Sequence, residues 1–215
     1  MNFLSHAVLA EKRSNDPAYV LGSMLPDFAS MAGLRIASVE DPQVSKGVDF
    51  HHAGDDAFHG APLFLEMMGD ARDTLETSGL DMGPAMAVSH VGLELLLDGW
   101  LVTREGAGAY RRAMLHAHKH GATVRWTRTR GQEQWQKICT RLRDAPIPER
   151  YVEPKFITER LQRMLAHRPR LALREENLNA VHAWTLATKP QLWERASELF
   201  DQVESRLATT RPSFA

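Results

Sequence analysis

One short stretch, GVDFHHAGDDAFH at residues 47–59, constrains this chain most, because it combines three histidines with three aspartates. Its flanks favour a helix: Asp41 followed by Pro42 is an N-cap with proline in the first turn. Downstream, Pro62 disfavours a helical residue before it and ends the segment. The stretch therefore predicts a helix that is rich in imidazole and carboxylate groups.

Three of these side chains, His51, Asp55 and His59, stand at steps of four and stack along one helical face. Neutral imidazoles and ionised carboxylates one turn apart can bind a common divalent cation at about 2.0–2.2 Å. The alternative is an ordinary solvated face, since His–Asp pairs at this spacing are common helix contacts. A metal site needs further ligands, so other segments decide between the two readings.

A second helix, predicted over Ala85–Thr103, carries polar residues on one line: His90, Glu94 and Asp98, again at steps of four. Nearly all of its other residues are apolar, which is typical of a helix buried on most sides. A carboxylate in such surroundings is costly unless it is paired, hydrogen-bonded or bound to metal. We expect these three residues to lie close to the His51–His59 row in the folded protein. The alternative is that Glu94 and Asp98 face a solvent groove or pair with arginines.

Two residues nearer the N-terminus, His6 and Asp27, are weaker candidates when each is taken alone. His6 lies in an apolar helix predicted over Asn2–Glu11, where a histidine is more often a satisfied core residue than a ligand. Asp27 follows Pro26 at a predicted helix boundary and is more often a helix cap. They become candidate ligands only together with the histidines and carboxylates of the other segments.

The remaining pattern is helical almost throughout, and it predicts an all-α fold in one domain over residues 1–215. Residues 1–105 form the half with the metal site, and 106–215 contribute a basic segment and C-terminal helices. Two of those helices are expected over Arg174–Thr188 and Pro190–Ala208. Only Val124–Arg130 alternates enough for a short strand.

Composition excludes several classes of protein. A net charge of -1 gives no overall attraction to nucleic acid or to an anionic membrane, and we expect neither as a partner. A single cysteine, Cys139, excludes an internal disulfide framework and fits a reducing compartment. Apolar Met1–Ala10 lacks a basic n-region, and no apolar run approaches the ~20 residues of a membrane span. We therefore expect a cytoplasmic protein.

Four ordered motifs carry a resemblance to a known family: NFLSH at residues 2–6, LGSMLPDF at 21–28, GVDFHHAGD at 47–55 and LELLLDGWL at 93–101. Each motif is weak alone, but their order and spacing together resemble the acyl carrier protein phosphodiesterase family over about the N-terminal half of the chain. That family is similar to the HD-domain phosphohydrolases, which are all-helical and hold a divalent metal with His and Asp from several helices. The resemblance therefore implies an HD-domain-like helical bundle.

The resemblance also implies an activity: removal of phosphopantetheine from a serine of holo-acyl carrier protein, with manganese or magnesium. A mixed shell of imidazole and carboxylate suits manganese, iron or zinc, and we expect manganese first, with magnesium, iron and zinc as alternatives. Such a cation polarises a phosphoryl oxygen and makes water a better nucleophile near neutral pH. The positions that match the family's metal ligands are His6, Asp27, His51, Asp55 and Asp98.

The chain departs from the family pattern at four positions. His52 replaces an arginine, Gly54 a branched residue, Gly99 a histidine, and Glu94 an aspartate. The ligand set can persist through these changes while the substrate pocket differs. His59 and His90 are imidazoles that the pattern does not require, so they are possible additional ligands and make a pair of metals conceivable.

For proton transfer we nominate His52 or Glu94, as groups outside the matched ligand set. Other chemistries find less support: Cys139 lies in an amphipathic run, and the chain contains no GxSxG elbow, P-loop or GxGxxG motif.

A basic segment, 106–132, contains no Asp or Glu. It can bind a phosphate or an acidic partner such as an acyl carrier protein, or it is a solvated face that pairs with acidic helices. Its alternating histidines at 116, 118 and 120 indicate a metal tract only weakly, because a helix turns them in different directions. The candidate contact residues are Arg111, Arg112, Lys119, Arg125 and Arg128.

Three functions remain open from the sequence. The first is phosphodiesterase action on holo-acyl carrier protein. The second uses the same site on a small phosphoester or nucleotide. The third is a non-catalytic helical binding module that keeps some of these residues as polar contacts.

Overall fold

The computed structural model describes residues 1–145 and 147–209, and it confirms the prediction of an all-α fold. Of the described residues, about 77% are helical, in eleven α-helices and a short 3-10 helix, and the sheet among them has two strands. The chain divides into two compact units, which are described separately below. Unit 1 comprises Met1–Asp56 and Arg104–Pro148, and unit 2 comprises Ala57–Thr103 and the chain from Glu149 onward. The prediction of a single domain stays a prediction.

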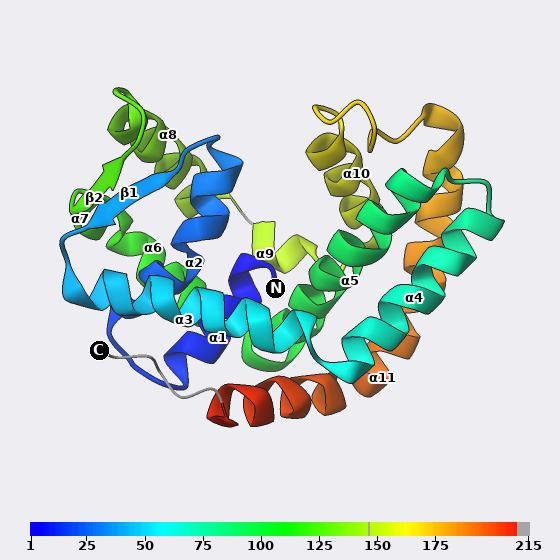
Figure 1. Cartoon of the computed structure of the whole chain (residues 1–215), viewed down its shortest axis with the longest axis horizontal. Helices are drawn as coiled ribbons and strands as arrows, with labels where there is room; N and C mark the ends of the chain where they lie inside the picture. The colour runs from blue at the N-terminus through cyan, green and yellow to red at the C-terminus, as the bar shows by residue number, and fades with distance from the viewer. Residues whose placement is uncertain (146, 210–215) are drawn as a thin grey trace. The chain divides into compact units, whose positions relative to one another are not determined.

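Unit 1 is built on the N-terminal helices and on the helices that lie within and directly after the basic segment (Figure 1). Helix α1 packs against α2 and α6, and α8 packs against α6, α7 and strand β2. Aromatic rings of Phe3, Phe28, Tyr110 and Trp135 fill the core between them and are fully buried. The elements of this unit are α1 (Phe3–Glu11), α2 (Pro17–Met31), β1 (Ile36–Val39), α3 (Pro42–His59, to Asp56 in this unit), α6 (Gly108–Leu115), α7 (Ala117–Gly121), β2 (Val124–Trp126) and α8 (Gly131–Asp144).

The small sheet pairs β1 with β2 antiparallel, and Figure 1 shows the two strands side by side. Ile36 lies opposite Trp126 and Val39 opposite Val124, with an irregular register between Ile36 and Ser38. The short strand expected near Val124 is thus confirmed, whereas its partner β1 lies where no strand is predicted.

Two glycines let α2 and α3 cross closely. A Cβ atom on Gly22 would lie 2.9 Å from the Cα of Gly47 and overlap the carbonyl of Val44. A Cβ atom on Gly47 would lie 2.7 Å from the Cα of Gly22 and overlap the carbonyl of Tyr19. Real Cβ atoms do not approach so closely, so only glycine fits at this crossing. The crossing positions α3 directly against the middle of α2.

Unit 2 is a set of long helices in which α11 packs along both α4 and α10 (Figure 1). Gly92 of α5 makes room for the ring of Trp184, since a Cβ there would lie 2.7 Å from two ring carbons. The indole of Trp193 donates a hydrogen bond to the carbonyl of Leu96 at 3.0 Å. The elements are α4 (Pro62–Thr77), α5 (Met82–Glu105, to Thr103 in this unit), α10 (Pro154–Leu165), a 3-10 helix (Glu175–Asn177) and α11 (Leu178–Thr209); α9 (Ile147–Arg150) spans the boundary between the units.

Helix α5 corrects one expectation, because it is long and apolar enough to cross a membrane by length and composition. Its most apolar window has a mean hydropathy of 1.4, and 61% of that window is buried inside the protein. The buried residues include Leu93, Leu95, Leu96 and Leu97. This burial is what a core helix of a folded protein shows, and it accounts for the apolar composition.

Two helix ends were predicted wrongly, because a proline was expected to end each helix. Helix α2 continues through Pro26 to Met31, so Asp27 lies inside a helix and the predicted boundary is wrong. Helix α11 likewise continues through Pro190, and the two helices expected there are one. A proline removes one hydrogen bond and bends a helix, but packing on both sides can keep the helix continuous.

Candidate metal centre

Two buried histidines from different helices meet in unit 1. His6 of α1 has no exposed surface and His51 of α3 is 4% exposed. Their rings stack with centroids 4.0 Å apart and an interplanar angle of 27°. Two positively charged imidazoles could not stack so closely in a buried site, so this pairing requires that at least one ring is neutral.

Ser23 of α2 ties both histidines to the same helix. The Nδ1 atom of His51 donates a hydrogen bond to the backbone carbonyl of Ser23 at 2.9 Å. The hydroxyl of Ser23 donates to the carbonyl of His6 at 3.2 Å, and also to that of Val20. A proton on Nδ1 leaves the lone pair of His51 on Nε2, and a carbonyl partner of this kind is typical of a metal-binding histidine.

Asp55, one turn after His51 on α3, collects nitrogen atoms around its carboxylate. The Nε2 atom of His6 lies 3.1 Å from Oδ1, and the Nε2 atom of His51 lies 3.4 Å from Oδ2. The amino group of Met1 is 2.6 Å from Oδ1. Three nitrogen groups, one of them an ammonium, thus converge on a carboxylate that is 31% exposed.

Asp27 completes the group. Ligand atoms of His6, Asp27 and His51 all lie within 4.8 Å of one another, as a shared ion requires. We call these three residues together with Asp55 the buried cluster. The sequence predicted all four as metal ligands, and the structure brings them together from α1, α2 and α3.

Burial and charge set the protonation of the buried cluster. Burial lowers the pKa of His6 to about 3, although its hydrogen bond with Asp55 acts in the opposite direction. Burial also acts to lower the pKa of His51, but the contact with Asp55 and the charge of Asp27 raise it above the ordinary value. Burial acts to raise the pKa of Asp55, yet hydrogen bonds from His51 and His6 hold it far below its usual range. A neutral His6 and an ionised Asp55 are the forms that bind metal.

The residues fit a divalent cation. The Nδ1 atom of His6 is buried and has no hydrogen-bond partner in the part of the chain that the structure describes. An unsatisfied buried polar atom costs about 1–3 kcal/mol, so a ligand that engages the ring would be favourable. The Met1 ammonium on Asp55 shows that the same carboxylate attracts a cation. Imidazole and carboxylate donors together suit a first-row transition metal.

Two departures from the family pattern have structural causes. A Cβ on Gly54 would lie 3.0 Å from the Cε of Met1 and 3.5 Å from the Nδ1 of His6, so the glycine lets His6 approach α3. A Cβ on Gly99 would overlap the backbone carbonyl of Tyr151. The family's histidine at this position would have no space, because the chain at Tyr151 occupies it.

The other predicted residues of these helices lie elsewhere. His52 is exposed, and its ring centroid is 5.4 Å from that of His51. Asp98 is fully buried on the part of α5 that belongs to unit 2, and its role as a ligand stays a prediction. His59, His90 and Glu94 form a second group in unit 2, whose ligand atoms also lie within 4.8 Å of one another. We call these three residues the helix-end cluster.

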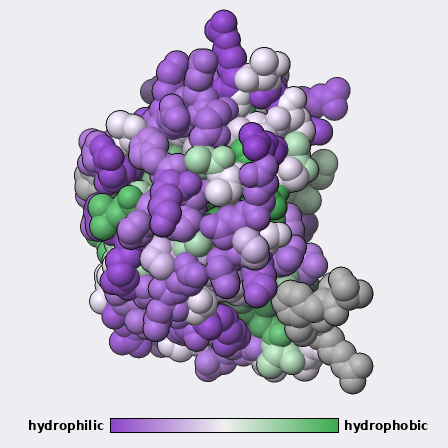
Figure 2. Space-filling model, turned by 90° about the vertical axis from the view of Figure 1, so that its left-hand side faces the viewer, coloured by the Kyte–Doolittle hydropathy of each residue, from purple (hydrophilic) through white to green (hydrophobic). Residues whose placement is uncertain are grey.

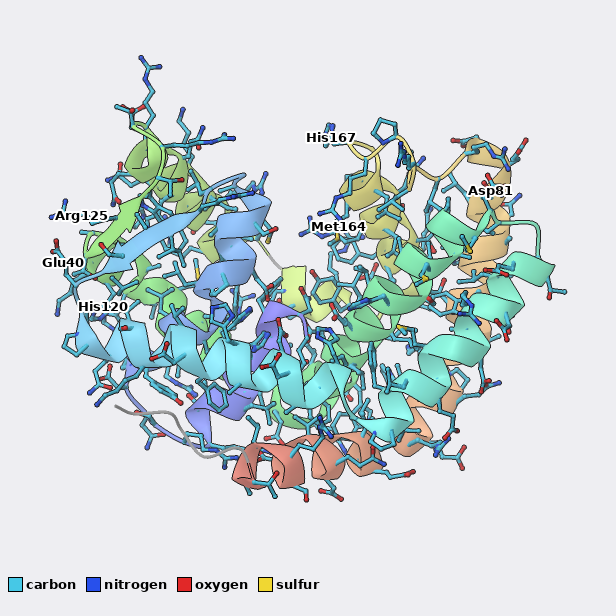
Figure 3. The ribbon with its side chains drawn as sticks, in the orientation of Figure 1. Glu40, Asp81, His120, Arg125, Met164 and His167 are labelled. Carbon is cyan, nitrogen blue, oxygen red and sulfur yellow. The ribbon has the colours of Figure 1, made fainter. Side chains whose placement is uncertain are left out.

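The basic segment places its candidate contact residues at the surface of unit 1. All five are exposed, and Figure 2 shows that the face carrying β1, β2 and α7 is mostly hydrophilic. Arg112 pairs with Glu11. Arg125 donates to Glu40 at 2.9 Å, and Figure 3 shows these two residues beside one another. Arg125 and Arg128 line a hollow of about 560 Å³ beside Trp126.

His120 has a structural role at the start of α3. Its Nδ1 atom lies 3.2 Å from Oδ2 of Asp41, and Oδ1 of the same carboxylate accepts from the backbone N–H groups of Gln43 and Val44. The rings of His116 and His120 are 6.1 Å apart, and among the described residues the alternating histidines form no group with metal-ligand spacing. The metal tract considered for them is therefore not supported.

Ser23 is the site residue that the sequence did not indicate. Its contribution to His51 is a backbone carbonyl, which every residue possesses, so no side-chain pattern could have identified it. The glycines of the α2–α3 crossing were the indirect signal, because both lie in the motifs quoted above.

Comparison with known proteins adds one positive finding. A family model described as acyl carrier protein phosphodiesterase matches residues 1–203. No curated protein matches the chain. No solved structure matches it.

Proposed function

Because the chain belongs to the acyl carrier protein phosphodiesterase family, whose members are phosphoric diester hydrolases, we propose that the buried cluster holds a divalent cation for this reaction. Membership implies hydrolysis of the phosphodiester that joins phosphopantetheine to holo-acyl carrier protein. The observation that carries the proposal is the grouping of His6, Asp27 and His51, from three helices, at ligand spacing.

The residues have distinct tasks in this proposal. A divalent cation, when bound, supplies Lewis acidity that polarises a phosphoryl oxygen and makes nearby water more acidic. His6, Asp27, His51 and Asp55 hold it, and Ser23 fixes the ring of His51 so that Nε2 carries the lone pair. We assign the fifth position to Asp98, in keeping with the family motif.

Manganese is the metal we propose, with magnesium, iron and zinc as alternatives. The shell combines two imidazoles with carboxylates, and this mixture favours a borderline cation over one that prefers oxygen alone. Metal analysis of the purified protein and of its His51→Ala and Asp98→Ala variants tests both the metal and the ligand set. If neither variant loses metal, the assignment is wrong.

Proton transfer falls to His52 in this proposal. His52 is exposed beside His51 and contributes no atom to the buried cluster. Glu94, the other candidate, has a carboxylate oxygen 3.1 Å from the Nε2 atoms of both His59 and His90, so those imidazoles already engage it. A His52→Gln variant should lower kcat and alter the pH profile while metal content stays constant. An unchanged kcat would remove His52 from the mechanism.

The exposed arginines and lysine of unit 1 are our proposed contact for the acidic carrier protein. Arg111, Arg112, Lys119, Arg125 and Arg128 lie on this surface, and it keeps a positive charge although Arg112 and Arg125 pair with Glu11 and Glu40. Long-range attraction to an acidic partner raises the association rate. Arg128→Glu should raise KM for holo-acyl carrier protein and weaken its dependence on salt, whereas kcat should change little. Unchanged KM would place the docking surface elsewhere.

A cytoplasmic location is also part of the proposal. It is supported by the free and buried thiol of Cys139, which fits a reducing compartment. Cell fractionation with detection of the native protein tests it, and recovery in a membrane or exported fraction would contradict it.

The decisive assay mixes the protein with manganese and holo-acyl carrier protein and follows the carrier by mass spectrometry. We expect loss of the phosphopantetheine arm with the wild type, none with His51→Ala, and normal loss with His167→Ala, an exposed histidine outside both clusters. Cleavage of small phosphodiesters with an unchanged carrier would mean that the same site serves another substrate.

A further inference from the structure

The helix-end cluster brings three donor atoms into a tight triangle within unit 2. His59 lies at the C-terminal end of α3, while His90 and Glu94 lie one turn apart on α5. The Nε2 atoms of His59 and His90 are 3.0 Å apart. The Oε1 atom of Glu94 is 3.1 Å from each of them.

Hydrogen bonds cannot satisfy all three sides of this triangle. If both Nε2 atoms carry protons and donate to Oε1, the short His59–His90 contact joins two donors with no acceptor between them. If one Nε2 atom is unprotonated, it can accept from the other, but its lone pair then faces the carboxylate. Without either proton, three lone pairs converge. Only a positive ion makes all three contacts favourable at once.

The spacing of the donors also matches one coordination geometry. Bonds of about 2.1 Å at right angles, as in an octahedral shell, place neighbouring donors about 3.0 Å apart. A tetrahedral shell with the same bonds would separate them by about 3.4 Å. The measured sides of 3.0 Å and 3.1 Å therefore fit one face of an octahedron. Two histidines and one carboxylate on one face are a known binding arrangement for a divalent metal with open positions.

Aromatic side chains hold the two rings in place. The ring of Phe64 lies 5.6 Å from that of His59 and 5.7 Å from that of His90, centroid to centroid. Phe58 contacts His59 on another side, with centroids 5.4 Å apart. Phe58 and Phe64 are buried, so they form a fixed wall behind the imidazoles. Pre-positioned donors reduce the entropy lost when an ion binds.

Exposure leaves room for an ion and its remaining ligands. The side chains of His59 and His90 are 36% and 42% exposed, whereas that of Glu94 is 12% exposed. Burial acts to raise the pKa of Glu94, but hydrogen bonds from His59 and His90 help to keep it well below the ordinary value. An ionised, mostly buried carboxylate beneath two accessible imidazoles gives an ion one anionic ligand and an open outer side.

We propose that His59, His90 and Glu94 form a second site for a divalent first-row transition metal, bound on one face of an octahedron with water on the other. The site shares no residue with the buried cluster, so it goes beyond the proposed function and does not depend on it. Manganese, iron and cobalt, which accept six ligands of this kind, are the chemical class that it fits.

Cobalt(II) is a suitable probe, because its visible spectrum distinguishes six-coordinate from four-coordinate sites. The full-length protein is stripped with a chelator, titrated with cobalt(II), desalted and analysed for metal by mass spectrometry. We expect two ions per chain in the wild type, one in His90→Ala, one in His51→Ala, and none in the double variant. His167→Ala, an exposed histidine outside both clusters, should keep two.

The cobalt that remains in His51→Ala should show the weak bands of a six-coordinate ion. Glu94→Gln should weaken cobalt binding at the helix-end cluster at least tenfold, while the circular dichroism spectrum stays unchanged. Equal cobalt content in His90→Ala and the wild type would overturn the site, as would intense four-coordinate bands in His51→Ala. Loss of cobalt in His90→Ala but not in His51→Ala would support this site and contradict the buried cluster instead.

Discussion

The two clusters are made from the same residue types, yet they differ in how their imidazoles are held. His6 and His51 of the buried cluster are 0% and 4% exposed, and His51 is fixed by a hydrogen bond to a backbone carbonyl. His59 and His90 of the helix-end cluster are more than a third exposed and are held by packing on Phe64. Burial and a fixed tautomer favour an ion that stays bound. Exposure favours one that exchanges with solvent.

The largest expected difference lies in activity. His51→Ala removes a ligand of the buried cluster, so we expect kcat/KM on holo-acyl carrier protein to fall by more than about 100-fold, beyond the usual loss for a group that only supports a ligand. His90→Ala should cost less than about tenfold. Steady-state kinetics with saturating manganese measure both. Equal losses of kcat/KM would contradict this difference and would show that the two clusters act as one catalytic unit.

A stability test addresses the scaffold beneath the buried cluster. Gly47→Ala adds a Cβ that overlaps the carbonyl of Tyr19, so α2 and α3 must separate. We expect a loss of about 1–3 kcal/mol in the free energy of unfolding, and weaker metal binding by the buried cluster. Denaturant unfolding and cobalt titration measure the two effects.

Gly69→Ala is the matched control in unit 2, because a Cβ on Gly69 of α4 meets no atom within 4 Å. It should raise stability by up to about 1 kcal/mol, since alanine favours a helix over glycine. If Gly47→Ala proved as harmless as Gly69→Ala, the close crossing of α2 and α3 would not position His51.

The N-cap of α3 gives a smaller effect that depends on pH. Burial acts to raise the pKa of Asp41, but hydrogen bonds from the backbone of Gln43 and Val44 and from His120 lower it overall. A lowered pKa means that the stabilisation is present above the unfolded value of about 3.9 and is lost as pH falls through the folded value. Asp41→Ala should therefore cost about 1 kcal/mol at pH 7, and less below pH ~4.

Asp41→Asn is the control for this test, because asparagine also caps a helix. Thermal unfolding of the three proteins at pH 7 and at pH 3 gives the comparison. A cost for Asp41→Ala that does not shrink at low pH would show that the charge of Asp41 is unimportant.

The smallest expected effect concerns the thiol of Cys139, which should not react in the folded protein. Burial raises the pKa of the Cys139 thiol to about 12, so a thiol reagent should not modify the folded protein at pH 8. Denatured protein should react fully. The same labelling checks the metal-site variants, because protection of Cys139 in His51→Ala shows that unit 1 is still folded. Rapid labelling of the wild type would contradict the burial of this core.

The sequence indicated the residues of the buried cluster in two ways: His51 and Asp55 stand at helical spacing, and His6 and Asp27 lie in motifs that resemble a known family. It predicted both ends of α3 closely, since the N-cap at Asp41 and the flanking prolines Pro42 and Pro62 are local signals. It missed the continuation of α2 through Pro26, because the packing that keeps this helix whole comes from distant segments. Strand β1 was missed for the same reason: its partner β2 lies far away in the sequence.

The grouping of the other histidines was also beyond the sequence. Steps of four along α5 relate His90 to Glu94, and steps of four along α3 relate His59 to Asp55, but no pattern shows that His59 pairs with Glu94. The sequence offered the additional imidazoles as possible further ligands for one metal or a pair, and the structure groups them with Glu94 in unit 2. Contacts between helices decide such groupings, and they follow from the tertiary packing.

The proposed role of the buried cluster is to hold the divalent cation of the phosphodiesterase reaction. Its most direct test is an anomalous difference map from crystals of the wild-type protein grown with manganese. We expect a strong peak bonded to His6, Asp27 and His51. A map that shows ordered manganese elsewhere and none among these three side chains would contradict it.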